Sequence, residues 1–121
     1  MTDSILGSVK KMLGITEEYE HFDTDIIIHI NSTFSILTQI GIGPETGFTI
    51  EDKSTSWDEF IPEDSHHLLE MVRTYMFMKV KSMFDPPTSS SVSEAYNRQI
   101  GELEWRLMVA ADTEVDAVNA E

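Results

Sequence analysis

Residues 23–41 read DTDIIIHINSTFSILTQIG, and this segment has the apolar spacing of an amphipathic helix. Its apolar side chains recur at steps of three and four residues, as one buried helix face requires: Ile27, Ile30, Phe34 and Leu37. We expect a helix from about Thr24 to Ile40 that ends at Gly41, because glycine adopts the left-handed cap conformation at little cost. The stripe predicts that other helices pack against this one.

Two more helices are predicted, one before this segment and one after it. A short amphipathic helix begins at residues 3–4, whose side chains accept the free amide hydrogens of a first turn, and ends at Gly14. Another helix begins around residues 62–64 and runs to about Phe84. Apolar side chains point in every direction between residues 75 and 84, so we expect this helix to be central and covered on several sides.

A fourth helix is predicted from the motif Ser91-Val92-Ser93-Glu94, which has the composition of a capping box. Its expected inner face contains Val92, Tyr96, Ile100, Leu103 and Leu107. Residues 111–121 are too polar and acidic to bury themselves alone, so we expect a mobile tail there. The predicted organisation is a helical domain over residues 1–110 followed by this acidic tail.

The long connection over residues 41–63 loses the helical period and is rich in turn formers. Residues 48–50 alternate as a short strand does, which leaves room for a small β-hairpin. Phe48, Trp57 and Phe60 are the expected contact residues of this loop. The fold class is therefore predicted to be all-α: a small four-helix domain with a long central loop and a flexible C-terminal tail.

Composition excludes several classes of protein. The chain has 121 residues, enough for one domain, and no cysteine, which excludes disulfide scaffolds, cysteine zinc sites and thiol catalysis. Its 22 acidic and 8 basic residues give a net charge of -14, so it does not bind phosphate backbones in general. No apolar run approaches the roughly 18 residues that cross a bilayer, and we expect a soluble, intracellular-type protein with no membrane partner.

Catalytic and metal sites find little support in the sequence. Glu63, His67 and Glu70 share one helix face at i, i+4 and i+7, which is a spacing suited to metal ligands. The favoured interpretation is a solvated first turn whose acids complement the helix dipole, because no second ligand-bearing helix accompanies it. We expect no catalytic residue, no metal and no cofactor.

The fourth helix has a second face, which lies roughly 200 degrees around the helix axis from Leu103 and so opposite the inner face. It carries Arg98, Gly101, Trp105 and Met108. A tryptophan opposite the core stripe, beside a glycine that permits close approach and an arginine that pairs with acids, is typical of a protein interface. The alternative is that the chain's own loop, residues 42–61, covers this face; both interpretations remain open on the sequence.

The order of these segments resembles the head-tail connector proteins of tailed bacteriophages, which are also called adaptor or head-completion proteins and are sometimes described as DNA-packaging proteins. The likeness spans about residues 4–109 and lies in the whole series of segments. These are Leu13–Thr16, Asp23–Asn31, Leu37–Gly41, the segment from Met76 to Asp85 that ends in Phe84–Pro87, and Arg98–Leu107.

The resemblance implies a structural protein of the virion neck, made in the host cytoplasm, with no enzymatic activity. Such proteins form a ring, typically of about twelve copies, beneath the portal protein. The ring extends the DNA channel, lets genomic DNA pass without specific binding, and provides a platform for the stopper or tail-completion protein. By the same resemblance residues 110–121 form a docking arm toward the portal, which adds Asp112, Glu114 and Asp116 to the interface candidates.

The charge of the chain agrees with this role, because acidic walls keep a DNA duplex from sticking as it passes. Subunits of such charge repel one another, so apolar contacts such as Trp105 must drive ring closure. We expect a monomer in isolation that assembles on its portal. The alternative functions are an acidic inhibitor that mimics DNA, a small regulatory binding protein, and a metal-dependent hydrolase that uses Glu63, His67 and Glu70 as ligands.

Overall fold

The structure is a computed structural model that describes the backbone of residues 4–61 and 66–119 and the side chains of residues 4–61 and 67–112. The described chain contains four α-helices, one short 3-10 helix and no strand, so the predicted all-α class is confirmed. In chain order the elements are α1 (Ile5–Met12), α2 (Asp23–Ile40), η1 (Trp57–Glu59), α3 (His66–Phe84) and α4 (Ser90–Asn119).

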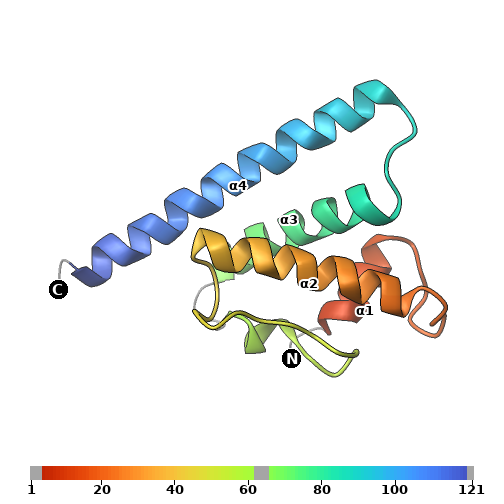
Figure 1. The fold of residues 1–121 in the computed structure, drawn as a ribbon, viewed down its shortest axis with the longest axis horizontal. Helices are drawn as coiled ribbons and strands as arrows, with labels where there is room; N and C mark the ends of the chain where they lie inside the picture. The colour runs from red at the N-terminus through yellow and green to blue at the C-terminus, as the bar shows by residue number, and fades with distance from the viewer. Residues whose placement is uncertain (1–3, 62–65, 120–121) are drawn as a thin grey trace.

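Helix α3 is the central helix, as predicted from its all-round apolar pattern. It packs against α1, α2 and α4, and its side chains Val72, Tyr75, Met76 and Val80 are fully buried. Helices α1 and α4 lie on opposite sides of it, while α2 crosses in front (Figure 1). This arrangement leaves α4 with one face against the body of the molecule and another face that no helix covers.

The ends of α1 and α2 follow from their sequences. The Ser4 hydroxyl accepts a hydrogen bond from the Gly7 amide at 3.1 Å, which caps α1 as predicted. Gly41 ends α2 with φ 103°, and the amide of Ile42 donates to Leu37 at 2.9 Å, a left-handed cap that glycine adopts readily. Three residues of the predicted α2 stripe are fully buried: Ile30, Phe34 and Leu37. Ile27, the fourth, is only partly buried, and the neighbouring Ile26 is fully buried in its place.

The central loop contains no strand over residues 41–61, so the β-hairpin is not confirmed. The Asn31 side chain of α2 takes both backbone groups of Ile50: its Nδ2 donates to the Ile50 carbonyl at 3.0 Å and its Oδ1 accepts from the Ile50 amide at 2.8 Å. Those are the groups with which a hairpin partner would pair. The loop is therefore held by a helix side chain where the alternating pattern suggested a second strand.

Aromatic rings hold the rest of the loop against the helices. Phe60 lies 4.6 Å from Phe34 and 5.1 Å from Phe48, measured between ring centroids. Trp57 is 1% exposed, and its indole nitrogen donates to the Ser8 hydroxyl of α1 at 2.9 Å. The loop thus becomes part of the core, and its aromatic side chains are used inside the subunit.

Helix α4 differs from the sequence prediction at both ends. It begins at Ser90, so Ser91 lies within the first turn and does not cap the helix, and Val92 is 48% exposed although it was placed on the inner face. At the other end the helical backbone continues to Asn119, so a mobile tail from residue 111 is not confirmed. Ala111 is 5% exposed and lies against Gly41, which holds α4 to the body beyond residue 110.

Candidate functional site

The outer face of α4 is a row of exposed side chains that we call the α4 ridge. It consists of Arg98, Gly101, Trp105, Met108 and Asp112. Trp105 is 64% exposed and Met108 is 51% exposed, so the loop over residues 42–61 does not cover this face and that alternative is wrong. Steps of three and four residues keep the ridge on one side of the helix for its whole length.

The inner face of α4 fixes the direction in which the ridge points. Leu107 is fully buried, and the hydroxyl of Tyr75 in α3 donates to Glu104 at 2.8 Å. Burial, and then the hydrogen bond and charge of Glu104, raise the pKa of Tyr75 well above its ordinary value. Lys79 adds an ion pair to the same carboxylate at 3.9 Å. The ridge is therefore presented on a helix that is anchored to the central helix of the fold.

The chemistry of the ridge suits a protein partner. Arg98 is exposed, and no acidic side chain of the described part of the chain pairs with it. A side chain at Gly101 would meet no atom within 4 Å, so nothing in the subunit requires a glycine there. Glycine inside a helix costs about 0.5–1 kcal/mol relative to alanine. An aromatic, a free cation and a gap for close approach are the features of an interface whose partner is another chain.

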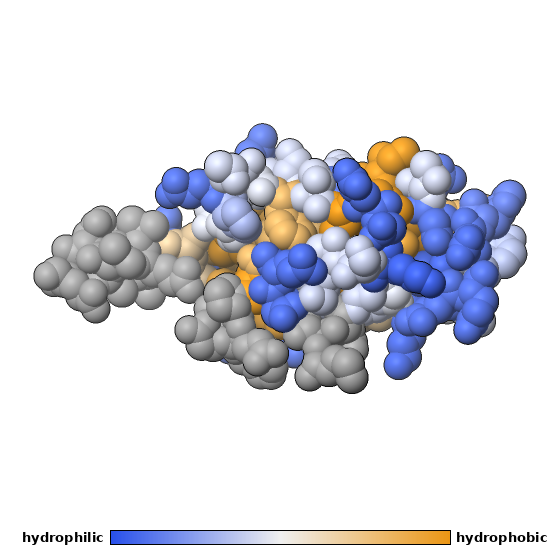
Figure 2. Space-filling model, turned by 90° about the horizontal axis from the view of Figure 1, so that it is seen from below, coloured by the Kyte–Doolittle hydropathy of each residue, from blue (hydrophilic) through white to orange (hydrophobic). Residues whose placement is uncertain are grey.

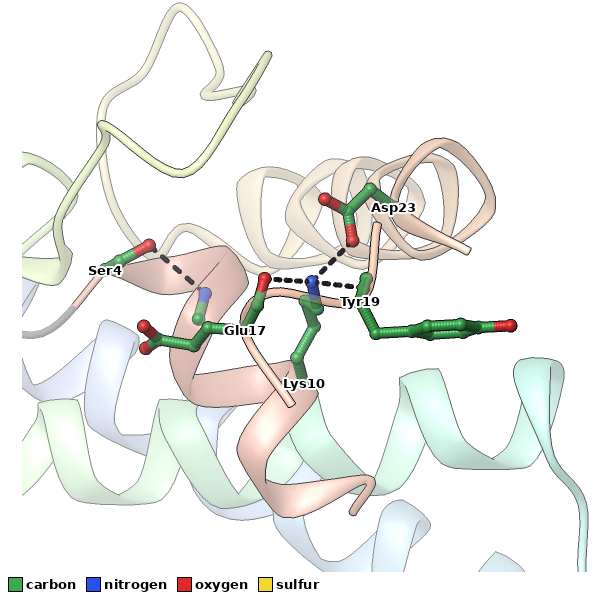
Figure 3. A network of polar contacts seen from close by, with 6 residues as sticks. Ser4, Lys10, Glu17, Tyr19 and Asp23 are labelled. Atoms are coloured by element: carbon green, nitrogen blue, oxygen red, sulfur yellow. Dashed lines mark hydrogen bonds and ion pairs between the residues drawn. The ribbon is translucent and has the colours of Figure 1, made fainter. Parts of the chain in front are cut away.

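A second organised site lies where the segment between α1 and α2 turns around Lys10 (Figure 3). Lys10 is 2% exposed, and its ammonium group binds the Asp23 carboxylate at 2.8 Å. It also donates to the carbonyls of Glu17 at 3.0 Å and Tyr19 at 2.8 Å. These contacts fix the path of an acidic segment that has no secondary structure of its own.

Sequence reasoning missed this role of Lys10. A signal was present, because Lys10 lies four residues after Leu6 and is therefore on the buried face of the first helix. A buried ammonium group needs acceptors, and several acids follow the helix in the sequence. The pattern predicts a buried ion pair but not its partner, since five acids follow within the next fifteen residues.

Several side chains that follow Lys10 in the sequence are exposed. In the connecting segment they include Glu18, Tyr19 and Glu20, and at the start of α2 they include Asp25 and Ile28. The Tyr19 ring is 49% exposed and points away from the ammonium group (Figure 3), and Ile28 is 59% exposed. Seen from below, hydrophilic residues gather at the end of the molecule where the segment between α1 and α2 lies (Figure 2).

The remaining candidates from the sequence do not form a common site. Among the residues whose side chains the structure describes, no three His, Asp or Glu side chains are arranged to hold a metal ion. Glu63 lies outside the described residues, and His67 and Glu70 are exposed on the first turns of α3. The side chains of Glu114 and Asp116 are also outside the described part.

A small all-α domain with a rigid, solvent-facing aromatic ridge has the features of a structural protein that binds other proteins. The model of the family described as phage connector protein matches residues 5–114, and the chain belongs to that family. The resemblance found in the sequence is thereby confirmed. Comparisons with curated proteins and with solved structures find no match.

Membership of this family gives the chain a structural role as a head-tail connector in the neck of the virion. Its family is one of structural virion components and not one of known enzymes. Within the described part of the chain, no helix is long and apolar enough to cross a membrane.

Proposed function

We propose that this connector is a ring-forming adaptor that docks beneath the portal protein, extends the DNA channel and provides the platform for the stopper or tail-completion protein. The observation that carries the proposal is the 64% exposed indole of Trp105 on an anchored helix of a connector-family chain. Burial of a tryptophan at the centre of an interface contributes strongly to binding, whereas its exposure in a monomer contributes nothing to folding.

The charge of the chain determines how such a ring assembles. Each subunit carries a net charge of -14, so subunits repel one another over a distance of about 10 Å at ordinary salt. Apolar contacts at Trp105 and Met108 oppose this repulsion, and a template that gathers the subunits lowers the entropic cost of association. The proposed state is therefore a monomer in isolation and a ring of about twelve copies on the portal.

The same charge suits the passage of genomic DNA. Proteins hold DNA through Lys and Arg that displace its counterions, and this chain has 8 such residues against 22 acids. A channel built from it repels the duplex and lets water fill the space between them. This is a structural contribution to DNA passage without specific binding.

The C-terminal part of α4 is the proposed docking arm toward the portal. Asp112 is exposed, and α4 projects past the other helices at this end (Figure 1). The sequence adds Glu114 and Asp116 in the next turn of the same helix. An acidic helix end of this kind would bind a basic surface of the portal.

Light-scattering mass, measured for the purified protein alone and after mixing with its portal protein, tests the proposal. We expect a monomer alone and a complex with many copies of the connector per portal. Trp105→Glu should abolish assembly on the portal while the circular dichroism and unfolding midpoint of the monomer stay unchanged. Met12→Glu is the matched control, since Met12 is also exposed, at 47%, but lies outside the α4 ridge. A stable ring of the purified protein at low salt would contradict the proposed mode of assembly.

A further inference from the structure

Two parts of this acidic chain carry no charge. The longest stretches of the sequence without Asp, Glu, Lys or Arg are residues 26–44, which include α2 after its first turn, and residues 86–93. We call residues 86–93, which join α3 to α4 and form the first turn of α4, the α3–α4 linker. Two copies of a chain with a net charge of -14 repel each other least where neither of the touching surfaces is charged.

A groove with a volume of about 390 Å³, which we call the α2 groove, lies between α2 and the central loop. None of the described residues that line it is charged: its α2 wall includes Ser35 and Gln39, and its loop wall includes Phe48 and Thr49. The side chains of Ser35, Gln39 and Thr49 are exposed and make no hydrogen bond within the described part of the chain. The backbone groups of Phe48 and Thr49 make none there either. The α2 groove therefore offers unused hydrogen-bonding groups beside an aromatic ring.

The α3–α4 linker has the chemistry of an occupant for such a groove. It begins Pro86-Pro87-Thr88-Ser89, and all four residues except the partly buried Pro87 are exposed. Proline fixes its own φ, so this segment is extended before any contact is made. Extended proline segments bind grooves that contain aromatic rings at a low entropic cost, and their backbone carbonyls remain available as acceptors.

We propose that the α3–α4 linker of one subunit occupies the α2 groove of a second copy of the chain. This inference rests on the proposed ring and names a contact between neighbouring subunits. The linker leads directly into α4, and Arg98 at the start of the α4 ridge is about 8 Å further along that helix. A neighbour that holds the linker therefore also lies near the beginning of the ridge.

The fold keeps the two surfaces of one subunit apart. Phe84, just before the linker, packs against Phe22 at the start of α2 with 5.3 Å between the ring centroids. The α2 groove extends from Asn31 to Gln39, about 14–26 Å further along α2. Figure 1 shows the connection between α3 and α4 at the end of the molecule where α2 begins. A subunit therefore does not fill its own groove, and a head-to-tail contact through these surfaces can repeat around a ring.

Crosslinking of the portal-bound connector tests this contact, because the chain has no cysteine of its own. The double variant Ser35→Cys/Ser89→Cys changes two exposed serines and removes no apolar side chain. After it is mixed with the portal protein, a short bis-maleimide should link connector chains into a ladder that extends beyond the dimer. The matched control is Thr24→Cys/Ser89→Cys, which moves one thiol to an exposed position at the start of the same helix and should give nothing larger than a dimer.

Light-scattering mass of the same mixture before crosslinking separates this contact from the proposed ring. Many connector copies per portal without a ladder from the test pair would overturn the contact and leave a ring built on other surfaces. A ladder of equal strength from the control pair would overturn it as well. A mass that shows no connector on the portal would refute the proposed ring, and the contact that rests on it.

A second measurement places charges in the contact. Gln39→Lys alone and Ser89→Glu alone should each weaken assembly on the portal at least tenfold, because each buries an unpaired charge. The double variant Gln39→Lys/Ser89→Glu should recover most of this loss, since the two charges then pair. Thr24→Glu, which adds a charge to α2 outside the groove, should assemble like the wild type. Single variants that assemble normally, or a double variant that does not recover, would contradict the contact.

Discussion

Replacement of Lys10 by methionine should be among the most destabilising single changes in the N-terminal half of the chain. Methionine retains the apolar stem of lysine but removes the ammonium group, which is 2% exposed and has three oxygen partners. The Asp23 carboxylate and two backbone carbonyls then lose their donor. Removing one member of a buried ion pair costs about 3–5 kcal/mol.

The expected loss lies at the low end of that range. The Asp23 side chain is 25% exposed, so water can replace part of the lost interaction. We expect a decrease of about 3 kcal/mol in the free energy of unfolding, which corresponds to a decrease of about 10 °C in Tm for a chain of this size. Urea denaturation followed by circular dichroism measures the first quantity and a thermal scan the second.

The neighbouring residue provides the control. Lys11 is exposed, so Lys11→Met changes the net charge by the same amount but should cost less than about 0.5 kcal/mol. The double variant Lys10→Met/Asp23→Asn should recover about 1 kcal/mol, because it removes the carboxylate charge left without a partner. Equal stabilities of the Lys10→Met and Lys11→Met variants would refute the view that this network organises the segment between α1 and α2.

Two further predictions concern the loop and the base of the ridge. Gly43→Ala should lower the unfolding free energy by about 3 kcal/mol in urea denaturation, because the residue has φ 85° and a methyl group there overlaps the Phe60 ring. Gly47 is the control: it has φ 92° without such an overlap, so Gly47→Ala should cost about 1 kcal/mol. Equal losses in the two variants would contradict a role of the Phe60 overlap. The raised pKa of Tyr75 means that its stabilising effect is complete below the ordinary tyrosine pKa of 10.0 and is lost as the pH rises above it. Stability of the wild type should therefore fall more steeply in alkaline urea titrations than that of Tyr75→Phe, and parallel profiles would argue against a buried hydroxyl held by Glu104.

The helices could be predicted because their signals are local. Helix α2 occurs within one residue of its expected range, since an apolar stripe, acids in the first turn and a terminal glycine all lie inside the segment itself. The position of Trp105 opposite the inner face of α4 also follows from periodicity, because a helix that buries Leu107 on one side turns the residue two positions earlier away from that side.

The errors of prediction occur where contacts come from elsewhere in the chain. The alternating pattern of residues 48–50 suggested a strand, but the amide group of Asn31, nineteen positions from Ile50, takes its backbone hydrogen bonds. The end of α4 was placed near residue 110 on polarity alone, and burial of Ala111 against Gly41 carries the helix further.

Periodicity, capping residues and charge were thus sufficient to predict an all-α acidic chain with an aromatic face on its last helix, because these properties depend on neighbours within about four residues. Only the tertiary structure, which brings distant segments together, decided three other features. These are the oxygens that surround Lys10, the contacts that hold the loop, and the fact that the loop leaves Trp105 uncovered. A sequence specifies which side chains need partners, whereas the packing of the helices selects the partners that they find.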